Sequence, residues 1–367
     1  MKCIFTGGGT LGHTNPAIAV AEAIRKLDSN ADILFIMRER GAENASVIER
    51  GFKIEEIPAY GLQRTGGVLN NAQATIRAII GTIKCISFIK HFRPDFIFGT
   101  GGYVSFAPLI AGAICGIPTY VHESNSTPGL VTRIAVKMGV FPFINFESTK
   151  RLLQTKKECI IVGMPLLPEF RNITKAEARK KLGIKEDKIY VISFGGSGGS
   201  DVMNETIMSY MTKLGKEKEK IIHLHATGEK YYSKAKEKYP MLCSGIQGQK
   251  IVPRIENMAL NMNAADIVIS RCGSSTLSEI SATKKASILI PSPNVTDNHQ
   301  YKNGKYLSDR NAAIMIEEKD LTDSVLGQQI TALAESKELR SKLERNLSGL
   351  GNEDAAQLIA NIILNGK

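Results

Sequence analysis

Twelve short apolar runs, each separated from the next by a segment with helical spacing, constrain the fold of this chain more than any other feature. Six lie in the first half of the 367 residues and six in the second. The runs cover residues 2–5, 33–37, 52–58, 95–99, 118–123, 140–145, 188–194, 221–228, 250–254, 266–271, 287–293 and 312–318. Strands that are apolar along their whole length are buried on both faces, so the pattern predicts an α/β fold with parallel sheets covered by helices.

The first run of each half leads into a glycine-rich turn. "FTGGGTLGH" spans residues 5–13, and "FGGSGGS" spans 194–200. Because the second half repeats the first, we predict two Rossmann-like doubly wound domains, whose ligands bind beyond the carboxyl ends of the strands. Between the halves, Thr174 and Glu177 form a capping box that opens a new helix, and we place the hinge at 162–172.

The first turn reads G-x-G-x-x-G through Gly7, Gly9 and Gly12, which is also the fingerprint of NAD-binding domains. Such domains carry an acidic residue at the end of the second strand to bind the ribose hydroxyls, whereas Arg38 stands at that place here. The chain also contains no D-x-D motif. We therefore expect neither NAD nor another cofactor, and no metal bridging a diphosphate.

Composition limits the possible partners. The 47 basic and 36 acidic residues give a formal net charge of +11, which suits nucleic acid, anionic lipid or a phosphorylated substrate. No basic stripe with interleaved aromatic residues occurs and Trp is absent, so nucleic acid is not expected. The sequence shows no signal-peptide pattern and no apolar run of the roughly 18 residues that span a bilayer, which predicts a cytoplasmic location.

The stretch "SRCGSSTLSEI" at 270–280 is the most informative single motif. After a strand and a glycine turn, Ser274, Ser275 and Thr276 stand where a helix begins, and the positive end of a helix suits a diphosphate. Glu279 lies one turn further on, where a carboxylate could hold both ribose hydroxyls of a nucleotide. The alternative interpretation is an ordinary capped helix with a surface glutamate.

Several motifs together resemble those of glycosyltransferase family 28. They are "TGGGTLGHTNPAIAVAEAI", "GTGGYVSFAPLIAGAICGIPTYVHESNSTPGL", "FGGSGGS", "SRCGSSTLSEI" and "PSPNVTDNHQYKNGKYL". The resemblance covers essentially the whole chain and implies the GT-B arrangement, in which two Rossmann-like domains face each other across a cleft. It implies an acceptor- and membrane-facing domain at 1–162, a UDP-sugar-binding domain at 163–350, and a C-terminal helix at 351–367 that packs back toward the first domain.

The members of this family that the chain resembles are bacterial inverting transferases of peptidoglycan synthesis. They move N-acetylglucosamine from UDP-N-acetylglucosamine to the 4-hydroxyl of undecaprenyl-pyrophosphoryl-N-acetylmuramyl-pentapeptide, which converts lipid I into lipid II. The resemblance also implies a set of substrate-binding residues. They are Ile255 at the uracil, Glu279 at the ribose, Ser197, Ser274, Ser275 and Thr276 at the diphosphate, His299 and Gln300 at the sugar hydroxyls with Asn303 behind them, and Thr10, Leu11, Gly12 and Asn125 from the first domain.

Such a reaction needs a base for the attacking hydroxyl, and we choose His13 because histidine exchanges protons near neutral pH. The other interpretation of His13 is a cap or loop-stabilising residue. We expect His122, beside Glu123, to fix the "HESN" turn rather than to act as the base. His223 and His225 lie on one face of a strand at a spacing that metals use, but no third ligand accompanies them, so we interpret them as structural.

Two positions depart from the family pattern. Gly198 stands where relatives commonly carry the glutamine of "GGSQG", and Leu167 stands where they usually carry an arginine near the diphosphate. Arg171 and Arg254 are the candidates to replace that cation. These changes leave the fold alone and bear on the affinity for the donor.

Residues 70–94 predict a helix that is apolar around more than one face. Its isoleucines at helical spacing are Ile76, Ile79, Ile80, Ile83, Ile86 and Ile89. Its flanking basic residues are Arg77, Lys84, Lys90 and Arg93. Such a helix is either buried or partly laid in a membrane interface, where its basic flank would favour anionic headgroups. The cytoplasmic membrane surface is thus an expected partner, with the protein peripheral on it.

Other functions remain open from the residues alone. A UDP-N-acetylglucosamine epimerase of similar build would need no acceptor, and the apolar, basic helix at 70–94 argues mildly against it. A paralogous transferase with another lipid or polysaccharide acceptor would carry the same donor motifs. A catalytically silent membrane scaffold would not bind UDP.

Overall fold

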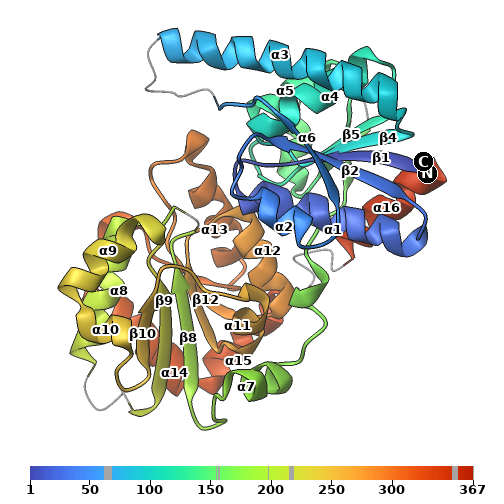
Figure 1. Ribbon diagram of the computed structural model, residues 1–367. Coiled ribbons are helices and arrows are strands. Elements are labelled where there is room, and N and C mark those ends of the chain that lie inside the picture. Colours follow the sequence, from blue (N-terminus) through green and yellow to red (C-terminus); the bar gives the residue numbers. More distant parts are fainter. Residues whose placement is uncertain are drawn as a thin grey trace. The chain divides into compact units, whose positions relative to one another are not determined.

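A computed structural model describes residues 1–61, 68–153, 155, 158–196, 198–214, 219–348 and 354–366. The chain divides into two compact units (Figure 1). The first comprises Met1–Leu167 together with Asn352–Lys367, and the second comprises Pro168–Gly351. The C-terminal segment therefore belongs to the same unit as the N-terminus.

The first unit is built on a seven-stranded parallel sheet in the order β3-β2-β1-β4-β5-β6-β7. Its strands are β1 (Lys2–Thr6), β2 (Asp32–Arg38), β3 (Lys53–Ile57), β4 (Phe96–Gly99), β5 (Thr119–Glu123), β6 (Phe141–Ile144) and β7 (Ile160–Ile161). Its α-helices are α1 (Leu11–Leu27), α2 (Asn44–Ile48), α3 (Val68–Phe92), α4 (Phe106–Ile114), α5 (Leu130–Lys137), α6 (Glu147–Leu153) and α16 (Ala355–Asn365). The strand order reverses between β1 and β4, and doubly wound sheets bind ligands at such a switch point.

Side chains alternate between the two faces of this sheet, and each face has its own core. Cys3 and Phe5 join α1 and α16 on one face, whereas Ile4 joins α3 and α4 on the other. The first of these cores contains stacked and tilted phenylalanine rings, with Phe5 centred 5.5 Å from Phe35 and 5.7 Å from Phe98. Ile359 of α16 is fully buried in the same core, so the last helix completes the first unit.

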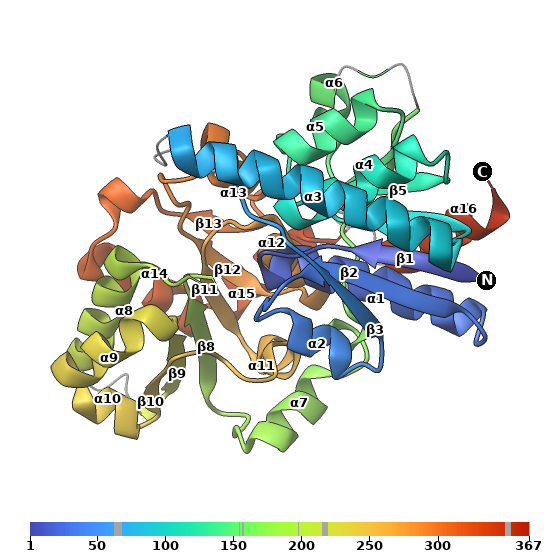
Figure 2. The ribbon, with the colours of Figure 1, turned by 45° about the horizontal axis from the view of Figure 1, so that its top comes forward.

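The second unit repeats this plan with a six-stranded parallel sheet in the order β10-β9-β8-β11-β12-β13. Its strands are β8 (Ile189–Phe194), β9 (Ile221–Ala226), β10 (Gln249–Val252), β11 (Ile267–Ser270), β12 (Ala286–Leu289) and β13 (Ile314–Met315). Its α-helices are α7 (Lys175–Leu182), α8 (Asp201–Lys213), α9 (Glu229–Lys238), α10 (Pro240–Ser244), α11 (Met258–Ala264), α12 (Ser274–Thr283), α13 (His299–Ser308), α14 (Asp323–Glu335) and α15 (Lys337–Asn346). Figure 2 shows α8, α9 and α14 on one side of this sheet, where their apolar residues form a core with Val191, Ile267 and Ile269.

The predicted α/β architecture with two parallel sheets is confirmed, and each of the twelve apolar runs overlaps a strand. Thr174 caps α7 as predicted, since both hydrogen bonds of the capping box with Glu177 are present. β7, a strand of two residues at the sheet edge, was not predicted, because so short a run carries no periodicity. Among the described helices, none is both long and apolar enough to cross a membrane.

Candidate active site

The first glycine-rich turn follows β1, at the carboxyl edge of the first sheet. A Cβ atom at Gly7 would lie 2.1 Å from the Thr100 side-chain oxygen and 2.5 Å from the backbone oxygen of His13. Only glycine therefore lets the first turn of α1 approach the loop that follows β4. The glycine pattern serves this close approach of two backbones.

A buried carboxylate holds the same turn. Glu43 is 4 % exposed, and its Oε1 accepts a hydrogen bond from the Gly9 N–H at 2.6 Å and another from Arg38 Nε at 3.0 Å. Although burial opposes ionisation, these hydrogen bonds lower the pKa of Glu43. Because this N–H already serves a carboxylate, the turn is less suited to a phosphate than its glycines suggest. Arg38, the residue that argued against NAD binding in the sequence, donates to the carboxylate that holds this turn.

His13 lies in the first turn of α1 with its ring against the backbone of Gly102. Its Nδ1 is 3.0 Å from the backbone oxygen of Thr100. A carbonyl only accepts, so Nδ1 carries the proton and donates it, and the lone pair of the neutral ring is on Nε2. Beside this histidine, Thr10 and Leu11 are exposed. The geometry gives His13 the tautomer that a base requires.

His122 differs from His13 in its surroundings, although both lie near the carboxyl edge of the sheet. It is fully buried on β5, and its Nε2 donates to the backbone oxygen of Gly163 at 2.8 Å. Burial lowers the pKa of His122 to about 4, and the charge of His13 adds to that effect. His122 is therefore neutral near pH 7 and bonded to the chain, which supports a structural role.

Glu123 organises the turn that contains Asn125. Its Oε1 accepts from the backbone and side-chain amides of Asn125 at 3.0 and 3.3 Å. Its Oε2 accepts from the Gly129 N–H at 2.9 Å and from the Thr132 hydroxyl at 2.6 Å. The Asn125 amide is thus engaged within its own turn, at the edge where the sequence analysis expected it to meet the donor.

The second glycine-rich turn follows β8 in the second unit. Ser200 caps α8, and its Oγ accepts from the Met203 N–H at 3.4 Å. Gly198 is exposed, and a Cβ atom there would meet nothing within 4 Å, so the turn has room for the side chain that relatives carry. Ser197, which the resemblance assigned to the diphosphate, lies outside the described residues.

Arg271, at the end of β11, joins three loops of the same sheet edge. Its Nη1 donates to the backbone oxygens of Ile290 and Pro291 at 3.2 and 3.1 Å. Its Nη2 donates to the Ser200 hydroxyl at 2.5 Å and also bonds the Glu318 carboxylate. From the sequence, Arg271 was predicted only to end a strand. The signal in the sequence was a charged residue directly between an apolar run and a glycine turn.

The "SRCGSSTLSEI" motif forms the predicted turn and helix. Gly273 precedes α12, so Ser274, Ser275 and Thr276 form its first turn, at the positive end of the helix dipole. Glu279 lies one turn after Ser275 and is partly buried, and loss of hydration raises the pKa of its carboxyl group to about 8. Because burial disfavours the charged form of Glu279, hydrogen bonds donated by ligand hydroxyls would stabilise its carboxylate.

The "DNHQYKN" segment packs against the neighbouring strand ends through two amides. Gln300 Oε1 accepts from the Ser292 N–H at 3.0 Å, and Asn303, which is fully buried, donates to the backbone oxygen of Cys272 at 3.3 Å. His299 is the partly buried first residue of α13. The structure therefore brings this segment to the turn that begins α12.

The cation that relatives carry near the hinge has a candidate replacement in the second unit. Leu167 packs against the core of the first unit. Arg171 follows Phe170, whose backbone oxygen accepts a hydrogen bond from the Asn263 side-chain amide at 3.3 Å. Asn263 lies near the end of α11, which leads to the amino end of β11. Arg254 is exposed and follows β10 at the carboxyl edge. Arg254 is thus the better placed of the two arginines.

Ile255, the residue after Arg254, is buried. A side chain that packs against the uracil base would be buried in the same way. Pro253, on the other side of Arg254, accepts from the Gly228 N–H at 3.0 Å, and Gly228 in turn packs against Gly199 of the second glycine-rich turn. The loop that carries Ile255 and Arg254 therefore adjoins that turn.

The two histidines of β9 belong to a buried hydrogen-bond chain. Ser193 Oγ lies 2.7 Å from His223 Nε2 and 2.8 Å from His225 Nδ1. His225 Nε2 lies 3.1 Å from Asn204 Oδ1, and the Asn204 amide donates to the backbone oxygen of Thr227 at 2.9 Å. Burial lowers the pKa of His223 to about 3 and that of His225 to about 4, so both are neutral. These bonds tie α8 to β8 and β9, which supports the structural interpretation.

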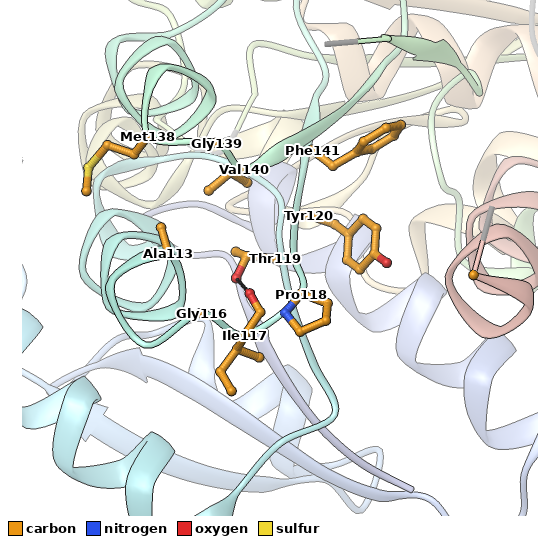
Figure 3. Close-up of a pocket in the computed structure, with 11 residues that line it drawn as sticks. Ala113, Gly116, Ile117, Pro118, Thr119, Tyr120, Met138, Gly139, Val140 and Phe141 are labelled. Carbon is orange, nitrogen blue, oxygen red and sulfur yellow. Dashed lines mark hydrogen bonds between the residues drawn. The ribbon is translucent and has the colours of Figure 1, made fainter.

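A pocket of about 440 Å³ lies elsewhere in the first unit (Figure 3). Tyr120 and Phe141, at the amino ends of β5 and β6, line it together with Met138 and Gly366. None of the described residues that the sequence points to as catalytic or substrate-binding lines this pocket. This pocket is therefore separate from the candidate active site.

Two family descriptions match the chain. The N-terminal domain of glycosyltransferase family 28 matches residues 3–139, and the C-terminal domain of the same family matches residues 190–359. Both glycine-rich turns and the "SRCGSSTLSEI" motif fall inside the matched residues.

Two proteins similar to the chain over nearly its full length carry the same name. The chain is 36 % identical over 364 residues to the UDP-N-acetylglucosamine--N-acetylmuramyl-(pentapeptide) pyrophosphoryl-undecaprenol N-acetylglucosamine transferase of Thermoanaerobacter sp. (strain X514), with 99 % of each chain covered. It is also 36 % identical over 363 residues to the protein of the same name from Acetivibrio thermocellus, covering 99 % of this chain and 97 % of that protein.

Solved structures agree with the observed fold. The crystal structure of Acinetobacter baumannii MurG covers 99 % of both chains with a TM-score of 0.73 and 22 % identity. A structure described as a putative UDP-N-acetylglucosamine 2-epimerase from Listeria monocytogenes gives a TM-score of 0.70 at 13 % identity, covering 100 % of this chain and 96 % of that one. At these identities the likeness concerns the fold alone.

His122 predicts a specific dependence of stability on pH. The folded pKa lies below the ordinary value, so the stability that neutral His122 contributes is present above pH 6.5 and is lost as the pH falls toward 4. The loss amounts to about 3 kcal/mol at most. A glutamine reaches nearly as far as Nε2 and can donate to Gly163. We expect His122→Gln to lose less stability than the parent in urea unfolding followed at about pH 7 and about pH 4.5. Equal losses would contradict this.

Proposed function

The chain belongs to glycosyltransferase family 28, and we propose that it transfers N-acetylglucosamine from UDP-N-acetylglucosamine to the 4-hydroxyl of undecaprenyl-pyrophosphoryl-N-acetylmuramyl-pentapeptide. The observation that carries this proposal is similarity over the full length to transferases of that name. The helices that begin at the carboxyl edges of the two sheets, α1 with His13 and α12 with Glu279, supply groups suited to the chemistry.

The reaction is an inverting displacement. The 4-hydroxyl oxygen of the acceptor forms a bond to the anomeric carbon of N-acetylglucosamine, while the bond from that carbon to the diphosphate oxygen breaks and its electron pair leaves with UDP. The hydroxyl proton passes to His13 Nε2, because Nδ1 already carries the proton donated to Thr100. The Thr100 carbonyl then also stabilises the protonated ring.

The second unit holds the donor in this proposal. The positive end of α12, with Ser274, Ser275 and Thr276, and the exposed guanidinium of Arg254 balance the charge that develops on the leaving diphosphate. Glu279 accepts hydrogen bonds from the ribose hydroxyls. Helix dipole and arginine together do the work that a metal ion does in other transferases.

Arg271 fixes these loops relative to one another. It joins the turn of Ser200 to the loop after β12, which leads to His299 and Gln300. We assign the sugar hydroxyls of the donor to these two residues, with Asn303 holding the segment from behind.

The acceptor is a membrane lipid, and α3 carries a surface suited to meet the bilayer. Four of its isoleucines are exposed, although the opposite side of the same helix is buried against the sheet through Cys85 and Ile89. These four, the isoleucine stripe, are Ile76 (56 % exposed), Ile79 (56 %), Ile80 (44 %) and Ile83 (63 %). With the basic residues beside it, the stripe fits the interface of an anionic membrane, so the enzyme would work as a peripheral protein on the cytoplasmic face.

Transfer of labelled N-acetylglucosamine from its UDP donor to a short-chain analogue of lipid I tests the proposal. We expect labelled disaccharide lipid, and no donor consumption in a parallel reaction without acceptor. Donor turnover without acceptor would instead identify an epimerase, and UDP binding without transfer would identify a transferase with another acceptor.

His13→Asn isolates the role of Nε2. The asparagine amide can still donate to the Thr100 carbonyl, so the turn keeps its hydrogen bond while the base is removed. We expect kcat to fall by about a hundredfold or more, with UDP affinity unchanged. His122→Gln serves as the matched control and should keep its turnover. Normal turnover in His13→Asn would exclude His13 as the base.

Glu279→Gln tests the ribose contact through pH. The raised pKa keeps Glu279 largely protonated near pH 7, so its carboxylate becomes available to the ribose only as the pH rises through about 8. Two charge-assisted hydrogen bonds should make UDP binding by the parent about tenfold tighter than by Glu279→Gln near pH 9. Near pH 6.5 the two should agree within a few fold. A pH-independent ratio in calorimetric titrations would refute this assignment.

A further inference from the structure

Arg77 occupies a particular place on α3. It follows Ile76 in the chain and lies on the flank of the isoleucine stripe. Its guanidinium lies over the ring of Tyr60, 3.8 Å from the ring centre. This stacking fixes a long side chain that would otherwise be disordered in solvent.

The charge of Arg77 is uncompensated in the described part of the chain. Lys84, two turns further along the same flank, pairs with Glu39 at 3.6 Å, and Arg38 pairs with Glu43. No carboxylate pairs with Arg77 among the residues that the structure describes. A planar guanidinium presents parallel N–H donors that match the oxygens of phosphate groups. Arg77 is therefore a fixed cation without a carboxylate partner among the described residues.

Contacts connect Arg77 to the turn that carries His13. Gly61, the neighbour of Tyr60, approaches the Tyr103 ring so closely that a Cβ atom on it would lie 3.1 Å from that ring. A Cβ atom on Gly9 would lie 2.7 Å from the same ring. Tyr103 thus stands between Gly9 and the Tyr60 segment. The isoleucine stripe is thus followed by Arg77, which stacks on Tyr60, then by Tyr103, and then by the first glycine-rich turn.

This order matches the chemistry of a lipid-linked sugar. In such a molecule the diphosphate lies between the apolar chain and the reacting sugar, as Arg77 lies between the isoleucine stripe and the turn of His13. The glycine-rich turn itself is a poor phosphate site, because the Gly9 N–H is already bonded to Glu43. A cation outside that turn is needed to meet the acceptor's diphosphate.

We propose that Arg77, held by Tyr60, binds the diphosphate of the polyprenyl-linked acceptor. This inference rests on the proposed function and names the residue that recognises its acceptor. Arg77 does not touch the reacting atoms, so it contributes to acceptor binding and not to the chemical step.

Arg77→Gln removes the charge, and Arg77→Lys keeps the charge but loses the planar fork. With a short-chain, water-soluble acceptor in the absence of membranes, we expect Arg77→Gln to raise the acceptor KM by tenfold or more. The donor KM and kcat at saturating acceptor should stay within about twofold. Arg77→Lys should lie between the parent and Arg77→Gln. The matched control Lys84→Gln, on the same flank, should leave the acceptor KM unchanged. An unchanged KM in Arg77→Gln would overturn the proposal.

Two further measurements separate this proposal from related ones. If Arg77→Gln loses binding to vesicles containing phosphatidylglycerol while its acceptor KM stays normal, Arg77 serves the bulk membrane and the proposal is wrong. Calorimetric titration with farnesyl diphosphate needs no transfer activity, so it decides the matter even if the parent transfers no sugar. We expect Arg77→Gln to bind farnesyl diphosphate at least tenfold more weakly than the parent while binding UDP equally well. Equal affinities for farnesyl diphosphate would refute the role of Arg77.

Discussion

Parallel pairing of buried strands is the constraint on which the rest of this structure depends. Parallel neighbours need crossover connections, so the helices must cover both faces of each sheet, and all strands of a sheet end at the same edge. The chain uses that edge twice. In the first unit it gathers the loops of Gly7, Thr100 and Glu123, and in the second it gathers those of Ser200, Arg271 and Pro291. No single loop forms a site, because each contributes only one or two groups.

Charged side chains hold the loops of this edge together in both units. Glu43 binds the N–H of the first glycine-rich turn, and Arg271 binds the residue that caps the helix after the second. Both are buried and both have an oppositely charged partner, Arg38 and Glu318 respectively. A buried ion pair contributes little net stability, but its bonds demand one geometry. These pairs therefore fix loop positions that apolar packing alone would leave variable.

Each unit also contains a partly exposed titratable or charged group to which we assign a substrate contact. Glu279 has a raised pKa, and Arg77 carries a charge that no described carboxylate balances. The buried histidines show the opposite arrangement, since His122, His223 and His225 are neutral and hydrogen-bonded. Glu279 and Arg77, to which we assign substrate contacts, are partly exposed, whereas these three histidines are buried within the fold.

The sequence by itself determined the strands, the glycine positions and the family, because each depends on the spacing of nearby residues. The apolar runs located twelve of the thirteen strands that the structure describes, and the motif residues of both units were found in local patterns. Tertiary structure alone decided which groups hold those motifs. The bond of Glu43 to Gly9 joins residues 34 apart, that of Arg271 to Ser200 joins residues 71 apart, and that of His13 to Thr100 joins residues 87 apart. Local periodicity carries no record of such contacts, so the tautomer of His13 and the exposure of one face of α3 emerge only when the sheet brings distant loops together.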